Sequence, residues 1–175
     1  MNDSRIEGYA RGLFEIARAE GTIDEVEDEL FRFARLYESN EELRNGLSDE
    51  QIPASRRQAI IEDLLGGKAT STTVQLISLI VGSGRARDLP AIVDKLVARA
   101  SAAKNLEVAE VRTAVPLTPD QETRLAAALA NASGKEVNLK VVVDPSVIGG
   151  VVATVGDTVI DGTVRTRLEQ LKSRL

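Results

Sequence analysis

In the first hundred residues the apolar positions recur at intervals of three and four, the period of an amphipathic α-helix. The stripe from Ile6 to Ala17 predicts a first helix that ends at Gly21, where a left-handed cap costs little. Five further helices are predicted, at about residues 23–37, 42–47, 53–65, 71–81 and 89–100. Six short helices with short connections are typical of a helical bundle, which we expect over residues 1–104.

The helix ends carry their own signals. Thr22 with Glu25 predicts a capping box for the second helix, and Ser39 with Glu42 predicts one for the third. Pro53 suits the first turn of the fourth helix. The stretches Gly66-Gly67 and Gly82-Ser83-Gly84 predict the ends of the fourth and fifth helices.

Beyond Asn105 the apolar period changes to two, which indicates β-strands. We predict strands over 109–115, 137–143 and 151–155, and a hairpin turn at Gly156-Asp157 that pairs residues 158–160 with the third strand. A helix opened by Thr118 and ended by Gly134 follows the first strand, and a final helix carries Val164, Leu168 and Leu171. The order β-α-β-β-β-α over residues 105–175 makes the whole chain α+β, mainly α.

Composition narrows the possible chemistry. The 175 residues include 22 Lys and Arg, 27 Asp and Glu, and no His, Cys or Trp, for a formal net charge of −5. Without His or Cys, the chain lacks the residues of Ser-His-Asp and Cys-His nucleophilic sites and of the usual zinc sites. Catalysis would therefore have to use carboxylates, Lys, Tyr, hydroxyls or an oxygen-bound metal.

No targeting or membrane-spanning segment is predicted. The first residues have no apolar core of signal-peptide length, and they are acidic where a transit peptide would be rich in Arg. The longest apolar stretch, residues 147–155, contains two glycines and a threonine and is far shorter than the roughly 18 residues that span a bilayer. We therefore expect any membrane association to be through a partner.

Charge and aromatic residues are unevenly distributed. Residues 1–50 carry 6 basic and 14 acidic side chains, a balance of −8, whereas residues 51–175 carry 16 and 13, a balance of +3. All five aromatic residues fall within the first 37 positions. The asymmetry suits a protein with two different contact surfaces, although on charge alone we favour a solvated acidic helix face.

Two glycine stretches fail as nucleotide-binding motifs. In Gly66-Gly67-Lys68-Ala69-Thr70, the first Gly of a phosphate loop would fall on Glu62, and Ala69 replaces the metal-binding hydroxyl. Gly82-Ser83-Gly84 lacks the third Gly of a dinucleotide fingerprint, since Arg87 stands there. Both stretches follow predicted helices, and helix termination explains them better.

Three carboxylates at turns of the second half, Asp144, Asp157 and Asp161, have the oxygen ligands that Mg²⁺ prefers. Each also suits a structural role: before Pro in a turn, after Gly at a hairpin, and as a helix N-cap. We favour these structural roles. We expect no metal, no cofactor and no bound nucleotide.

A β-α-β-β unit also invites comparison with RNA-binding modules, which stack bases on aromatic side chains. Residues 38–175 contain no aromatic residue, and residues 105–175 carry 8 basic and 9 acidic side chains. Nucleic-acid binding is therefore not expected.

The fifth predicted helix is unusually apolar. At about 100° per residue, the apolar side chains between Val74 and Val81 cover an arc of roughly 220°, leaving only Gln75 and Ser78 outside it. A surface helix needs a stripe nearer 100° wide. Either this helix is central in the bundle, which the arc alone favours, or one side is open to a partner helix.

Several motifs recur together in a known family. Residues 141–151 read V-V-V-D-P-S-V-I-G-G-V, and they are followed by Gly156-Asp157 and by I-D-G-T-V-R at 160–165. Residues 9–14 read Y-A-R-G-L-F, and Gly84-Arg85 follows the fifth helix. Over essentially its whole length the chain resembles the delta subunit of F-type ATP synthases, whose mitochondrial counterpart is the oligomycin-sensitivity-conferring protein.

The resemblance implies a non-catalytic stator subunit, one copy per complex. It implies that residues 1–104 bind N-terminal helices of the alpha subunits in the catalytic head, and that residues 105–175 bind the C-terminal ends of the membrane-anchored b subunits. The resulting peripheral stalk couples proton flow to ATP synthesis by keeping the head from turning. The implied location is peripheral, at the cytoplasmic face of a bacterial cell membrane.

The resemblance also implies site residues. Carried over by position, the groove for the alpha-subunit helix uses the first and fifth helices, with residues Tyr9, Ala10, Leu13, Val74, Ile77, Ser78, Val81 and Arg85. The second-half motif is expected to be structural: close backbone approach at Gly149 and Gly150, a turn at Gly156-Asp157 and an N-cap at Asp161, with Asp144, Gly162 and Arg165 in the same motif. Two alternatives stay open, a helix-binding adaptor of another complex and an enzyme that uses the turn carboxylates.

Overall fold

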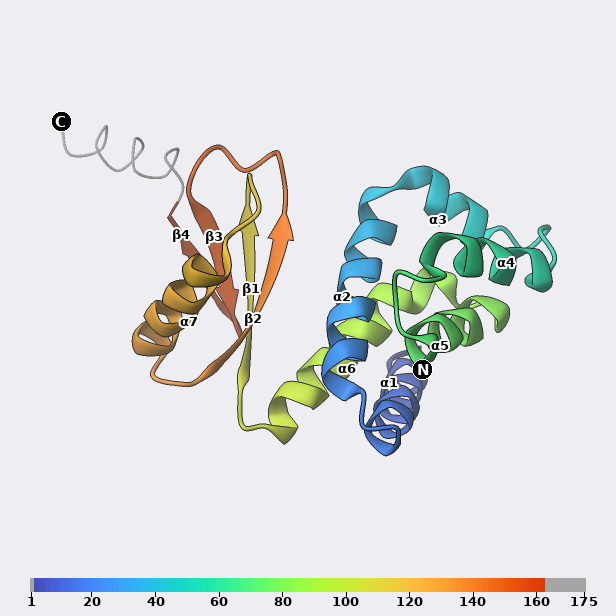
Figure 1. Ribbon diagram of the computed structural model, residues 1–175, viewed down its shortest axis with the longest axis horizontal. Helices are drawn as coiled ribbons and strands as arrows, with labels where there is room; N and C mark the ends of the chain where they lie inside the picture. The colour runs from blue at the N-terminus through green and yellow to red at the C-terminus, as the bar shows by residue number, and fades with distance from the viewer. Residues whose placement is uncertain (1, 163–175) are drawn as a thin grey trace. The chain divides into compact units, whose positions relative to one another are not determined.

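The computed structural model of the chain describes residues 2–162 (Figure 1). It divides into two compact units, Met1–Ala100 and Ser101–Leu175, each with its own interior. The first is helical and the second is built around a sheet.

The helical unit contains the six α-helices that the apolar period predicts. They are α1 (Asn2–Ala19), α2 (Ile23–Ser39), α3 (Glu41–Ser48), α4 (Ala54–Leu65), α5 (Ser71–Gly82) and α6 (Leu89–Ala103), with a 3-10 turn at Ala86–Asp88 before α6. Every one of these helices contributes to the core, which includes Leu13, Leu30, Leu47, Ile61, Ile80 and Leu96. Each helix thus buries part of its apolar stripe in this core.

Two predicted caps are wrong. Thr22 precedes α2 but makes no side-chain cap, and its hydroxyl is buried without a hydrogen-bond partner. The third helix is capped by Asn40, whose side chain accepts from the backbone N–H of Leu43 at 2.9 Å. Ser39 is instead the last residue of α2, and its hydroxyl donates to the carbonyl of Leu36.

Two hydrogen bonds fix the relation of α1 and α5. The Tyr9 hydroxyl, near the middle of α1, donates to Ser83 Oγ, just beyond the end of α5, at 3.3 Å. The Thr72 hydroxyl, early in α5, donates to the carboxylate of Glu20, just beyond the end of α1. Because the middle of α1 meets the end of α5 and the end of α1 meets the start of α5, the two helices lie side by side and antiparallel.

Ion pairs attach α6 to the helices around it. Arg35 on α2 pairs with Asp94 on α6 at 2.7 Å, and Arg99 on α6 pairs with Glu7 on α1. Such partly exposed pairs contribute little stability individually, about 0–1 kcal/mol. They fix orientation more than they add to the free energy of unfolding.

The second unit is a four-stranded sheet with one described helix. Strands β1 (Glu107–Thr113), β2 (Val137–Val143), β3 (Val151–Val155) and β4 (Thr158–Asp161) lie in the order β2-β1-β3-β4. β1 is parallel to β2 and antiparallel to β3, and β3 and β4 form the predicted hairpin with Val155 opposite Thr158. Gly156, with φ +55°, is the first residue of the two-residue turn.

Helix α7 (Pro119–Ser133) packs its Leu125 and Leu129 on one face of this sheet, against Ala109, Val111 and their neighbours. Its predicted cap is confirmed as a full capping box, in which the Thr118 hydroxyl accepts from Gln121 N–H and the Gln121 side chain accepts from Thr118 N–H. Gly134, with φ +73°, ends it as predicted.

The first strand is displaced from its predicted position. It ends at Thr113, so Val115 lies outside it and is exposed. Two hydrogen bonds hold Thr113. Its carbonyl accepts from Asp144 N–H, just beyond β2, at 2.7 Å, and its hydroxyl donates to the carbonyl of Val115, two residues along the chain. These bonds turn the chain away from the sheet before Pro116.

The fold class, α+β and mainly α, is confirmed. The predicted final helix, the N-cap role of Asp161 for it, and Arg165 depend on residues 163–175, which lie outside the described part of the chain.

Candidate protein-binding site

Burial decides which of the predicted groove residues a partner can touch. Ala10 and Leu13 on α1, and Ile77 and Val81 on α5, are core residues with at most 1% of their surface exposed. Tyr9, Val74, Ser78 and Arg85 are half-buried. The predicted set therefore mixes residues that build the two helices into the core with residues that reach the surface.

The α1 side of the surface follows from helix geometry. Tyr9 and Glu20 both contact the α5 region, so their direction marks the flank of α1 that borders α5. At about 100° per residue around the helix axis, the direction of Ile16 is within roughly 40° of the directions of Tyr9 and Glu20. The direction of Gly12 is about 40° beyond that of Ile16, further from the core. Ile16 is 41% exposed, and a Cβ added at Gly12 meets nothing within 4 Å. This flank combines an apolar side chain with an open backbone position.

The α5 side follows in the same way. Thr72 and Ser83 mark its border with α1, and Leu79 lies next to that border, 51% exposed, with Gln75 beyond it. Val74 and Ser78 lie on the opposite flank, where Gln58 of α4 donates to the carbonyl of Ser78 at 3.2 Å. The wide apolar arc of α5 thus contains a buried stripe and an open apolar position beside α1.

The exposed pair Ile16 and Leu79 was not among the residues predicted for the groove. Both fit the same helical period as the core residues beside them, so the apolar pattern alone does not separate these exposed residues from buried ones. A sequence-based signal does exist on α1, where Gly8 and Gly12 lie four apart on the polar side of the stripe, a poor choice for a helix unless something approaches closely.

The N-terminus of α5 is occupied by the chain itself. The Glu29 carboxylate on α2 accepts from Thr70 N–H at 3.0 Å and from the Thr70 hydroxyl at 2.8 Å. Burial favours the neutral acid, but hydrogen bonds from Thr73 and Thr70, with the charge of Arg32, outweigh it and lower the pKa of Glu29. A phosphate would have to displace this carboxylate, which agrees with reading Gly66–Thr70 as a helix end.

Arg85 lies three residues beyond the end of α5 and is half-buried. Its guanidinium pairs with Asp88 at 3.2 Å across the turn that leads into α6. Its charge is therefore partly neutralised within the chain.

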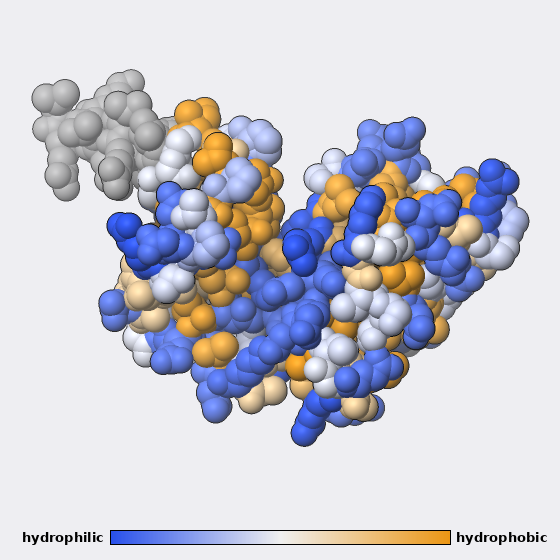
Figure 2. All heavy atoms as spheres, viewed as in Figure 1, coloured by the Kyte–Doolittle hydropathy of each residue, from blue (hydrophilic) through white to orange (hydrophobic). Residues whose placement is uncertain are grey.

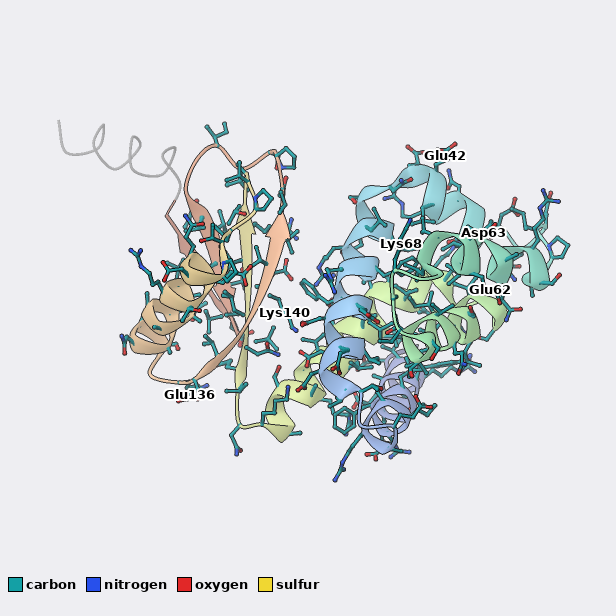
Figure 3. The ribbon with its side chains drawn as sticks, in the orientation of Figure 1. Glu42, Glu62, Asp63, Lys68, Glu136 and Lys140 are labelled. Atoms are coloured by element: carbon teal, nitrogen blue, oxygen red, sulfur yellow. The ribbon has the colours of Figure 1, made fainter. Side chains whose placement is uncertain are left out.

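The carboxylates do not converge. Glu42 lies on α3 whereas Glu62 and Asp63 lie on α4, all three exposed (Figure 3). Among residues 2–162, no group of three or more acidic side chains is placed to hold a metal ion.

The second-half motif is a set of turns where it is described. Asp144 Oδ1 accepts from the hydroxyl of Ser146 at 2.6 Å and from its backbone N–H at 2.9 Å, and Arg112 lies 3.5 Å from Oδ2. The Ser146 bonds, with Arg112, hold the pKa of Asp144 below its usual value. Gly149 and Gly150 have φ of +63° and +78°, so both are needed for the backbone conformation.

The remaining motif residues extend the hairpin. Asp157 completes the turn after Gly156, Asp161 pairs with Val152 at the end of β4, and Gly162 N–H donates to the carbonyl of Val151 at 2.9 Å. These residues form the turn and the far end of the β3–β4 hairpin at the edge of the sheet.

The geometry therefore defines a two-unit α+β protein whose helical unit exposes two large apolar side chains, Ile16 and Leu79, beside the border of α1 and α5. Residues 6–175 match the family described as ATP synthase delta (OSCP) subunit. The ATP synthase subunit delta of Streptomyces avermitilis is 43% identical over 159 residues, which cover 91% of this chain and 58% of that protein. That of Symbiobacterium thermophilum is 35% identical over 175 residues, covering 100% of this chain and 94% of that protein.

The chain thus belongs to the ATP synthase delta (OSCP) subunit family, whose members are non-catalytic structural subunits of the peripheral stalk. The family confirms the expected resemblance and the expectation of a non-catalytic subunit. The chain spans less than two thirds of the length of the Streptomyces relatives that it matches.

A solved structure shares the fold. A chain of the Toxoplasma gondii mitochondrial ATP synthase hexamer aligns with a TM-score of 0.57 and 24% identity, covering 97% of this chain and 96% of that one. Within residues 2–162, none of the helices has the length and apolar character to cross a bilayer.

Proposed function

We propose that this chain is a stator subunit that joins the catalytic head of a proton-translocating F-type ATP synthase to its membrane-anchored b subunits. Its helical unit binds an N-terminal helix of an alpha subunit, and its sheet unit binds the C-terminal ends of the b subunits. The complex holds it at the cytoplasmic face of a bacterial cell membrane. The linkage resists the torque of the rotor, so that proton flow is coupled to ATP synthesis.

The observation that carries the head-binding half is the exposed apolar pair beside the α1–α5 border. Ile16 and Leu79 come from adjacent antiparallel helices and are 41% and 51% exposed. Covering the exposed half of two such side chains contributes about 2 kcal/mol in total. An amphipathic helix laid along the border would cover both at once, with Tyr9 as an aromatic anchor at one end.

The glycine face of α1 supports a helix as the occupant. Gly8 and Gly12 present no side chain, and the space above each is empty to 4 Å. A helix backbone can approach such a surface more closely than one lined by larger side chains. In this proposal Gly12, Ile16 and Leu79 take the place of the core residues Ala10, Leu13, Ile77 and Val81 as the contact surface.

The division into two units supports a linking role. Each unit has a separate hydrophobic core, so each can keep its own binding surface while the chain joins two partners. The alternative, an adaptor of another complex, would use the same α1–α5 surface for a different helix.

The test is a titration of the full chain with a synthetic peptide of the alpha-subunit N-terminus and, separately, with the soluble C-terminal fragment of the b subunit from the same organism. The proposal requires saturable binding of both and a ternary complex of one copy each of chain and peptide with the b fragment. Two results would favour the adaptor: binding of the peptide and the b fragment that is mutually exclusive, or binding of the b fragment without any binding of the alpha-subunit peptide.

A further inference from the structure

The end of the sheet where β1 and β2 finish carries three exposed apolar side chains, Val115, Val143 and Ile148, which are together called the patch. These side chains are 65%, 47% and 66% exposed. They come from separate stretches of the chain: Val115 follows β1, Val143 is the last residue of β2, and Ile148 lies in the loop between β2 and β3. Figure 2 shows hydrophobic surface at this end of the unit.

Sheet order explains why these residues gather. Thr113, the last residue of β1, is paired with Val143 on one side and with Val151 on the other. The β2–β3 loop, residues 144–150, must therefore arch over the end of β1, a span of about two strand spacings or 10 Å (Figure 1). Ile148 is carried on this arch, and Val115 lies two residues beyond the end of β1 that the arch crosses.

The arch is held in one conformation by its own bonds. Asp144 accepts both polar hydrogens of Ser146 and pairs with Arg112 of β1. Val147 N–H donates to the carbonyl of Asp144, and Gly149 N–H to that of Val147, each at 3.1 Å. A large apolar side chain on so constrained a loop is presented outward without a further ordering cost on binding.

The charges around the patch are paired within the unit. Arg112 contacts Glu110 at 3.2 Å as well as Asp144 at 3.5 Å. The charged side chains of Arg112, Glu110 and Asp144 are thus paired with one another, which favours an apolar face of a partner over a charged segment.

The size of the patch limits what covers it. Three partly exposed aliphatic side chains offer on the order of 300 Å². A stable self-dimer buries about 800 Å² on each partner. One or two turns of an amphipathic helix, which present apolar residues at intervals of three and four, match the smaller area.

We propose that Val115, Val143 and Ile148 form the contact of this unit with the apolar face of a single b-subunit helix, and that the Asp144–Gly150 arch serves to present Ile148 to it. This inference rests on the proposed function, because it assigns the residues of the b-binding half. The most specific sequence motif of the chain then has a binding role in addition to its turn geometry.

The experiment titrates the full chain with the soluble C-terminal helical fragment of the b subunit. The variants are Ile148→Ser and Val115→Ser, and the matched control is Val159→Ser on β4, whose side chain is 65% exposed but lies outside the patch. We expect each patch variant to weaken b binding about tenfold or more, with the control within twofold. Affinity for the alpha-subunit peptide stays unchanged in all three.

The outcomes separate the two proposals. Normal b binding by both patch variants overturns the patch and leaves the stator function standing, whereas no b binding by the parent chain removes the b-binding function and the patch together. If the parent chain sediments as a dimer and the Ile148→Ser chain sediments as a monomer, the occupant of the patch is a second copy of the chain. A lower Tm of the free Ile148→Ser chain with unchanged b binding would make the chain's own residues 163–175 the occupant, and either result overturns the proposal.

Discussion

Replacing Gly12 by alanine should change stability and binding in opposite directions. Gly12 lies inside α1 with an exposed, helical backbone, and an added Cβ meets nothing within 4 Å. A glycine inside a helix costs about 0.5–1 kcal/mol relative to alanine. Gly12→Ala should therefore stabilise the free helical unit by about that amount, a rise in Tm of several degrees for a unit of this size.

The same methyl group should weaken binding if a helix lies against this face. Overpacking a tight contact by a methyl or methylene group typically costs about 1–3 kcal/mol. Since about 1.4 kcal/mol corresponds to a factor of ten, the alpha-subunit peptide should bind Gly12→Ala about 5- to 150-fold more weakly. Stability is measured by urea unfolding of the full chain followed by circular dichroism, and affinity by calorimetric titration.

Gly46 supplies the control. It lies in α3, away from the α1–α5 border in sequence and contact, and an added Cβ there also meets nothing within 4 Å. Gly46→Ala should stabilise the chain similarly and leave peptide binding unchanged. Unaltered peptide affinity in a stabilised Gly12→Ala chain would refute the reasoning, because a partner helix could not then be seated on this flank of α1.

Three other predictions follow from the contacts above. Tyr9→Ala should weaken the alpha-subunit peptide by about 1–3 kcal/mol in the same titration, while Tyr9→Phe, which loses only the bond to Ser83, should bind as the parent does. Thr118→Ala removes one half of the α7 capping box and should lower the free energy of unfolding of the sheet unit by about 0.5–2 kcal/mol in urea. Glu29→Gln should destabilise the helical unit at pH 7, and the loss should shrink as the pH falls below 4.5: the folded state lowers the pKa of Glu29, so the carboxylate stabilises the fold above its unfolded pKa and stops doing so as it is protonated. Thermal unfolding at pH 7 and pH 3 checks this, with exposed Glu62→Gln as the control, and a deficit equal at both pH values would contradict it.

The elements of this fold are readable from the sequence because each depends on a local period. The helix ends are harder to predict, and the two threonines predicted as caps, Thr118 and Thr22, show why. Thr118 and Thr22 carry the same kind of signal, yet Thr118 has extended backbone, with ψ 157°, and caps its helix, whereas Thr22 has ψ 21° and does not. The preceding Gly21 turn, with φ +71°, sets the backbone of Thr22, and nothing in the S/T-x-x-E pattern reports that constraint.

The proposed binding surface was assigned to α1 and α5 only through resemblance, and which of its residues are exposed needed the structure. Leu13 and Ile16 are both large, apolar and on the same stripe of α1, but Leu13 is buried and Ile16 is not. The difference depends on where α5 lies, which is fixed by contacts between residues more than fifty positions apart, such as Glu20 with Thr72. Periodicity within one helix contains no information on such contacts.

Glycine identity is similarly ambiguous until the backbone is known, and this bears on how the chain's motifs should be interpreted. Gly149 and Gly150 have positive φ, where another residue costs about 1–2 kcal/mol, so alanine there should destabilise the arch that carries Ile148. Gly12 has a helical backbone, where alanine is favoured, so the backbone conformation does not require glycine there, and the proposed function explains it by the approach of a partner helix. The same substitution therefore separates the two roles: a glycine that serves the fold loses stability as alanine, and one that serves a partner gains stability and loses affinity.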